Sequence, residues 1–176
     1  MKRLLLLRHA KTERDNPGGD HARILTERGI ADATLVGGIL RARNWRPDHV
    51  LCSNAARTTQ TWEIARAQMG IAERPDYSRA LYLASSHTIL SQIQSTPDSA
   101  GTLLIIGHNP GMEDCAIALV RREGSREEFE LLHQMREKYP TSGLSAFEFP
   151  IEHWRDVRFG EGQILAFLKP RDARAD

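Results

Sequence analysis

The sequence has few cysteines, no long hydrophobic run and almost no net charge. Its two cysteines, Cys52 and Cys115, each lie in an apolar stretch, which favours reduced, buried thiols in a cytoplasmic protein over a disulfide framework. The apolar run near the N-terminus, Leu4–Leu7, has four residues. That is shorter than the apolar core of a secretory signal, about 7–15 residues, and no stretch approaches the roughly 20 of a membrane span. A formal net charge of +1 argues against nucleic acid or an anionic membrane as partner.

The sequence also lacks internal repeats, low-complexity tracts and an interdomain linker. With 176 residues, it is long enough to bury a core without metals or disulfides. These features predict one domain over residues 1–170, followed by a frayed C-terminal tail over residues 171–176.

Strands and helices alternate along the chain. Apolar runs predict strands at 2–7, 48–53 and 102–108, and helical patterns follow Thr26, occupy 55–69 and 88–93, and follow Pro110. Two further strands, at 144–150 and 162–170, are expected at an antiparallel edge. The mixed charges of residues 121–138 indicate a solvated helical face, with an interaction surface as the alternative. The alternation predicts an α/β fold: a three-layer α/β/α sandwich with a mostly parallel central sheet and antiparallel edge strands.

Polar side chains follow the buried strands at the points where those strands end. The first strand ends at Arg8 and His9, and the strand over 102–108 ends at His108. Arg57 lies one turn into the helix after the second strand. Because ligands bind at the carboxyl ends of parallel strands, we expect these four side chains to meet at one edge of the sheet.

Two guanidiniums and two imidazoles with no obvious carboxylate partner make an anion-seeking site. Arginine donors match phosphate oxygens in pairs, and a helix that starts at Pro110 adds free N–H groups nearby. Taken singly, a histidine at a strand end is usually structural and Arg57 would usually be a surface residue, so the combination carries the argument. Neither HxH nor HExxH spacing occurs, and two arginines beside the histidines would repel a cation, which argues against a metal centre.

Four segments resemble motifs of the histidine phosphatase superfamily, the phosphoglycerate mutase-like proteins. They are "LLLLRHAKT" (4–12) for the RHG signature, "RILTERG" (23–29) for L-T-x-x-G, "SNAARTTQT" (53–61) for S-x-x-x-R-T-x-Q-T, and "IIGHNPG" (105–111) for the later GH motif. The short chain and the "GHNPG" form are most similar to the bacterial phosphohistidine phosphatase branch of the SixA type. Ala10 departs from the family's glycine, a change that a negative φ at this position tolerates.

The resemblance implies a phosphatase with a histidine nucleophile. His9 would attack phosphorus through a neutral ring nitrogen, while its other nitrogen donates to a backbone carbonyl. Arg8, Arg57 and His108 would hold the phosphoryl oxygens. The phosphohistidine intermediate would be hydrolysed by water, without a metal or organic cofactor.

Two residues near the nucleophile remain open. Thr12 and Asn16 are candidates for further phosphate contacts, with capping of their own loop as the alternative.

Three functions remain open at this point. The first is a phosphatase that removes phosphate from phosphohistidine on a protein, such as a histidine-containing phosphotransfer protein of signal transduction. The second is a phosphatase or mutase that acts on a small phosphate ester. The third is a non-catalytic protein that binds phosphate. Cleaving an ester expels an alkoxide, which needs an acid, whereas imidazole leaves far more readily. The segment over 74–88 holds Tyr82 but no carboxylate after Asp76, which favours a phosphoramidate substrate. Five carboxyl groups could supply an acid from elsewhere: Glu13, Asp15, Asp20, Asp76 and Glu113.

Overall fold

The structure is a computed structural model that describes residues 1–173. The strands are β1 (Lys2–Arg8), β2 (His49–Ser53), β3 (Asp76–Ser78), β4 (Thr102–Gly107), β5 (Leu144–Phe149) and β6 (Gln163–Leu168). The helices are α1 (Glu27–Ala42), α2 (Ala56–Met69), α3 (Ser86–Gln94), α4 (Gly111–Leu119), α5 (Arg126–Glu137) and α6 (Pro170–Ala173).

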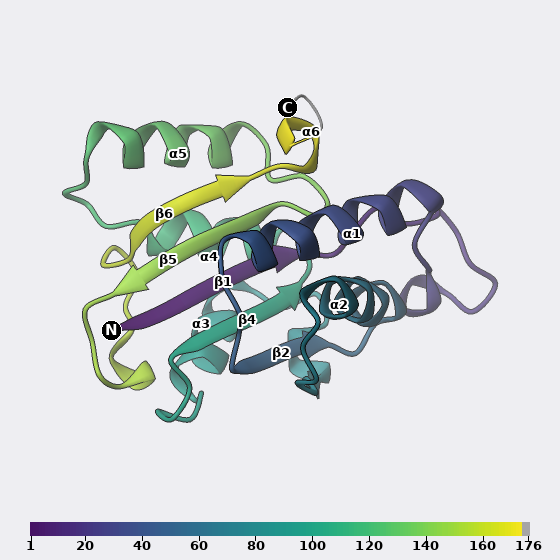
Figure 1. Ribbon diagram of the computed structural model, residues 1–176, viewed down its shortest axis with the longest axis horizontal. Helices are drawn as coiled ribbons and strands as arrows, with labels where there is room; N and C mark the ends of the chain where they lie inside the picture. Colours follow the sequence, from purple (N-terminus) through teal and green to yellow (C-terminus); the bar gives the residue numbers. More distant parts are fainter. Residues whose placement is uncertain (174–176) are drawn as a thin grey trace.

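The strands form one sheet in the order β3-β2-β4-β1-β5-β6. The first four of these run parallel, whereas β5 pairs antiparallel with both β1 and β6. Figure 1 shows α1 and α2 in front of the sheet and α3 and α4 behind it. The prediction of an α/β fold with a mostly parallel sheet and antiparallel strands at one edge is therefore confirmed.

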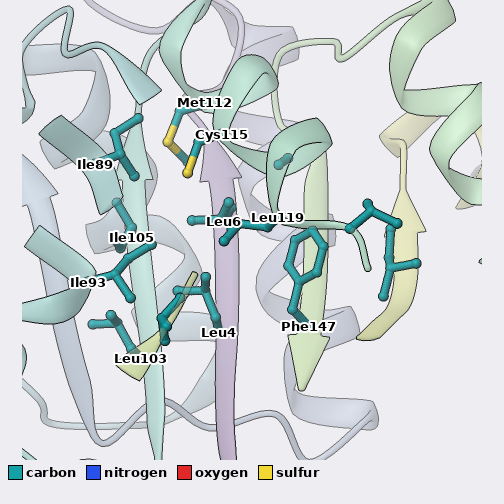
Figure 2. Packing of buried hydrophobic residues seen from close by; sticks show 14 of the residues in the cluster. Leu4, Leu6, Ile89, Ile93, Leu103, Ile105, Met112, Cys115, Leu119 and Phe147 are labelled. Carbon is teal, nitrogen blue, oxygen red and sulfur yellow. The ribbon is translucent and has the colours of Figure 1, made fainter. Parts of the chain in front are cut away.

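The leucine run of β1 is buried on both faces of the sheet. Leu4 and Leu6 pack into the cluster formed with α3, α4 and α5, as Figure 2 shows for part of that cluster. Leu5 and Leu7 pack on the opposite face against α1 and α2. All four are 0% exposed, and burying each such side chain contributes about 1.5–3 kcal/mol, so β1 is anchored firmly up to the point where its polar residues begin.

Local signals set the helix ends near the site. The hydroxyl of Thr26 accepts a hydrogen bond from the backbone N–H of Gly29 at 3.1 Å, which caps α1. Gly70 ends α2 with a φ of 65°, a left-handed conformation that glycine adopts without strain. The sequence predicts a helix start after Thr26 and a helix end at Gly70, and α1 begins and α2 ends at these positions.

The remaining expectations concern the C-terminus and membranes. Residues 171–173 of the expected tail belong to α6, and residues 174–176 lie outside the described part of the chain. Of the helices in residues 1–173, none is both long and apolar enough to span a bilayer.

Candidate active site

The end of β1 delivers Arg8 and His9 to the carboxyl edge of the sheet. The backbone N–H of His9 donates to the carbonyl of Gly107 at 3.1 Å, which ties the end of β1 to the end of β4. On the other side, the N–H of Ser142 donates to the carbonyls of both Arg8 and His9. The two side chains therefore project from a backbone held on both flanks.

His9 is buried and neutral. Its Nδ1 lies 2.8 Å from the carbonyl oxygen of Ala10, a pure acceptor, so Nδ1 carries the proton and Nε2 keeps its lone pair. Burial lowers the pKa of His9 to about 4, with Arg57 and Arg8 adding to the effect. At neutral pH the imidazole therefore presents an unprotonated nitrogen, which is the state a nucleophile needs.

His108 lies beside His9 at the end of β4. Their ring centroids are 5.3 Å apart. The Nε2 of His108 lies 2.7 Å from the Ser53 hydroxyl at the end of β2, so the two strand ends are joined through side chains. Burial, together with the neighbouring His9 and Arg57, lowers the pKa of His108 to about 3.

Arg57 projects from the first turn of α2 and is only 2% exposed. Its Nη1 donates to the backbone carbonyl of Asp20 at 2.8 Å, and its Nη2 lies 3.1 Å from the Asp20 carboxylate. Arg8 is less constrained: within residues 1–173 its guanidinium makes one hydrogen bond, from Nη1 to the carbonyl of Tyr139 at 2.9 Å. Its other donors have no hydrogen-bond partner in this part of the chain, and its Nε is buried.

These side chains line one cleft of about 420 Å³. The lining includes all four residues expected at the strand ends, together with Thr12 and Asp20. Cationic groups dominate it, because Lys11, Arg14 and Arg23 also lie on its wall. The cleft is thus positively charged, and two neutral imidazoles are part of its wall.

Thr12 and Asn16 differ in position. Thr12 lines the cleft, although its hydroxyl accepts a hydrogen bond from Arg23 Nη2 at 2.5 Å. Asn16 does not line it: its Nδ2 donates to Glu13 at 2.7 Å and its Oδ1 accepts from the N–H of Gly18 at 2.8 Å. Asn16 therefore caps its own loop, because both its amide nitrogen and its amide oxygen form hydrogen bonds within that loop.

One of the five candidate carboxyl groups, Asp20, lines the cleft within residues 1–173. The Tyr82 hydroxyl donates to Asp20 Oδ2 at 2.5 Å, and Arg23 binds Oδ1 at 3.0 Å. These hydrogen bonds, with the charge of Arg57, hold the pKa of Asp20 well below its usual range. Asp20 is therefore an ionised acceptor at neutral pH and lacks the proton that a general acid must donate.

The other four carboxyl groups have different partners or positions. Burial raises the pKa of Glu113, but this side chain accepts from Asn109 Nδ2 at 3.1 Å and is not part of the cleft wall. Glu13 binds Asn16 within its loop, Asp76 at the start of β3 pairs with His49 on β2, and Asp15 is exposed.

Motif residues without an assigned chemical role hold the site together. The hydroxyl of Thr61, the last residue of "SNAARTTQT", accepts from the N–H of Ala10 at 3.0 Å, and the Gln60 side chain accepts from the N–H of Leu25 at 2.8 Å. A Cβ on Gly29 would lie 2.1 Å from the carbonyl oxygen of Lys11, so only glycine lets α1 approach this loop. Ala10 is not among the residues with positive φ, so its methyl group is tolerated.

Sequence reasoning did not assign the positioning roles of three residues, two of which, Asp20 and Tyr82, it considered only in the search for an acid. Ser53 binds His108, Asp20 binds Arg57, and Tyr82 binds Asp20 while its ring lies edge-on to His108 at 5.5 Å between centroids. Ser53 carried a signal, since it opens the S-x-x-x-R-T-x-Q-T segment at a strand end. The pairing of Asp20 with Arg57 carried none, because Asp20 sits in a polar loop with several other charged residues. No group of three or more potential metal ligands occurs in residues 1–173.

The fold and this cleft define an α/β enzyme that acts on phosphate. A sequence profile of the histidine phosphatase superfamily (branch 1) matches residues 4–80. An uncharacterized protein of Mycobacterium tuberculosis is 37% identical over 165 residues, covering 94% of this chain and 100% of the relative.

Solved structures agree with the profile. A candidate phosphohistidine phosphatase SixA from Agrobacterium tumefaciens is 31% identical, with a TM-score of 0.78 and coverage of 96% of this chain and 98% of that one. Another from Nakamurella multipartitia is 28% identical, with a TM-score of 0.81 and 96% coverage of both chains. The chain belongs to the histidine phosphatase superfamily and is similar to its SixA members. It is a phosphatase.

Proposed function

We propose that this chain dephosphorylates phosphohistidine on a protein, with His9 as the nucleophile. One observation carries the proposal: a buried, neutral His9 opens onto a cationic cleft whose wall, in the described part of the chain, holds no protonated carboxyl group. The similarity to SixA phosphohistidine phosphatases supports the same substrate class.

The reaction has two displacements at phosphorus. The Nε2 lone pair of His9 forms a new P–N bond while the P–N bond of the substrate breaks and its imidazole leaves with that electron pair. Water then attacks the phosphoryl group on His9, the His9 P–N bond breaks with its electron pair returning to Nε2, and inorganic phosphate departs as H2PO4⁻ with both protons of the water. Arg8 and Arg57 hold the phosphoryl oxygens in both steps, since their fixed charges lie where negative charge is transferred.

The substrate class follows from the leaving group. An imidazole that is protonated at its other nitrogen leaves as a neutral molecule, so the enzyme need not donate a proton to it. An alkoxide leaves only with protonation by an acid. Within the described cleft wall, the one carboxyl group is Asp20, which is ion-paired to Arg57 and hydrogen-bonded to Tyr82. The site therefore favours a phosphoramidate over an alkyl phosphate.

Rapid-quench labelling tests the nucleophile. Wild-type enzyme mixed with a ³²P-phosphohistidine protein is expected to give an acid-labile, base-stable phosphoenzyme, with the label on the peptide that contains His9. His9→Ala should lose turnover by several orders of magnitude yet still bind inorganic phosphate through the arginines. A label on another residue, or normal turnover in His9→Ala, would contradict the assignment.

A substrate panel tests the leaving-group argument. The ratio kcat/KM is measured for the phosphohistidine protein, 3-phosphoglycerate and an alkyl phosphate under the same conditions, with the protein substrate expected to react fastest. Faster turnover of either ester would overturn the proposed substrate class. In that case Asp20→Asn and Glu113→Gln identify which carboxyl group acts as the acid, because the responsible variant loses ester hydrolysis.

A further inference from the structure

A second cleft of about 550 Å³ adjoins the catalytic cleft. The two share Arg8, Lys11 and Thr141 in their walls, so they lie side by side on the surface. The second cleft extends away from His9 between the first half of α1, the segment that follows α5, and α6. Figure 1 shows α6 beside α1 beyond the carboxyl end of β6.

The second cleft is cationic although the chain as a whole is nearly neutral, at +1. Its lining includes six basic and three acidic side chains. Two of the basic groups are compensated by acidic neighbours in the same lining, through the pairs Arg28–Asp32 and Lys169–Asp172. Lys11, Lys138 and Arg171 form no ion pair within residues 1–173, and all three are exposed.

The two clefts suit different anions. In the catalytic cleft Arg57 is almost fully buried and its guanidinium plane is held by Asp20, an arrangement that suits the fixed geometry of one phosphoryl group. In the second cleft the uncompensated charges sit on exposed, flexible side chains, two of them lysines. Such charges are strongly hydrated and act as point charges, so they suit several carboxylates spread along a chain.

We propose that the second cleft docks an acidic polypeptide segment of the phosphorylated protein, next to the phosphohistidine that His9 attacks. The proposal rests on the proposed function, since it assumes a protein substrate in the catalytic cleft. It assigns Lys138 and Arg171 to substrate recognition, away from the reacting atoms. The contribution should be electrostatic and should therefore weaken as salt is added.

Charge reversal at these two positions tests the proposal. The test variant is Lys138→Glu/Arg171→Glu, and the control is Arg126→Glu/Arg155→Glu, which reverses two exposed charges that line neither cleft. The substrates are phosphoramidate and two synthetic peptides with a central phosphohistidine flanked by three glutamates or by three glutamines on each side. All are assayed at low and at high NaCl.

The wild type and the control should hydrolyse the glutamate peptide with a kcat/KM about fivefold to tenfold above the glutamine peptide at low salt. The test variant should lose this preference through KM, while its turnover of phosphoramidate stays at the wild-type rate. Retention of the preference in the test variant, or its loss in the control, would overturn the docking proposal. Equal turnover of both peptides by the wild type would do the same.

Two further measurements separate the possible causes of failure. If the wild type hydrolyses none of the substrates, the proposed function fails, and docking is still decided by whether a fluorescent glutamate peptide binds the wild type more tightly than the test variant. The second measurement is the kcat/KM for 1,3-propanediol bisphosphate in the wild type and in the test variant. If the substitutions at Lys138 and Arg171 lower this kcat/KM but leave that of the glutamate peptide unchanged, the second cleft binds a second phosphate group and the polypeptide proposal is wrong.

Discussion

Mild acid should destabilise this protein, because two histidines of the site are buried in the neutral form. An unfolded histidine has a pKa of about 6.5, whereas His9 and His108 have pKa values of about 4 and about 3 in the folded protein. Between these values the unfolded chain binds protons that the folded chain does not. This part of the free energy of unfolding is therefore fully present above about pH 6.5 and is lost as the pH falls toward the folded pKa values.

The size of the effect follows from the shifts. At pH 4.5, His9 accounts for a loss of about 2.5 kcal/mol, at 1.36 kcal/mol per pKa unit, and His108 for a similar loss. Together they would remove roughly 5 kcal/mol, a large part of the 5–15 kcal/mol that stabilises a typical domain.

Urea unfolding at pH 7.5 and pH 4.5, in buffers without phosphate or sulfate, measures this loss. In His9→Asn the amide N–H can still reach the carbonyl of Ala10, but the titrating group is gone, so this variant should lose about 2.5 kcal/mol less than the wild type between the two pH values. His133→Asn, at an exposed histidine, is the matched control and should lose as much as the wild type. An equal loss in His9→Asn and the wild type would refute the view that His9 is held neutral by burial.

Further predictions concern catalysis and packing. Arg57→Lys keeps the positive charge but loses the planar guanidinium with its paired donors, so kcat/KM should fall about 100-fold. Wild-type activity in this variant would mean that the charge alone is sufficient. Asp20→Asn removes a negative charge that competes for Arg57, so inhibition by inorganic phosphate should strengthen about twofold to fivefold, and weaker inhibition would contradict this competition. In Gly111→Ala the new Cβ would lie 1.8 Å from the carbonyl oxygen of Ala84, so urea unfolding should show a loss of about 1–3 kcal/mol, and an unchanged midpoint would contradict the predicted clash. Incubation with EDTA should leave turnover unchanged, and strong inhibition would reveal a required metal.

Most of the fold could be predicted from local sequence patterns. The apolar runs of β1 and β4 are continuous because both faces of those strands are buried, and a run of this kind is visible without any knowledge of distant contacts. The rule that parallel strands end at one edge then brings His108 next to Arg8 and His9, although His108 lies 99 residues after His9 in the sequence. The tautomer of His9 also depends on a neighbour in sequence, Ala10.

The tertiary structure decided the electrostatic state of the site and the extent of its surface. Asp20 and Arg57 are 37 residues apart, and their pairing depends on how a polar loop crosses the sheet edge, which no local pattern encodes. The low pKa of His108 arises from burial and from neighbours on other elements, so it is absent from the isolated segment "IIGHNPG". The second cleft likewise exists only because α1, α6 and the segment after α5 meet in space, bringing Lys11, Lys138 and Arg171 close to one another. The pKa values and the charge of a site depend on all the residues that surround it in space. Many of these residues are far apart in the sequence, so only the tertiary structure shows which of them are neighbours.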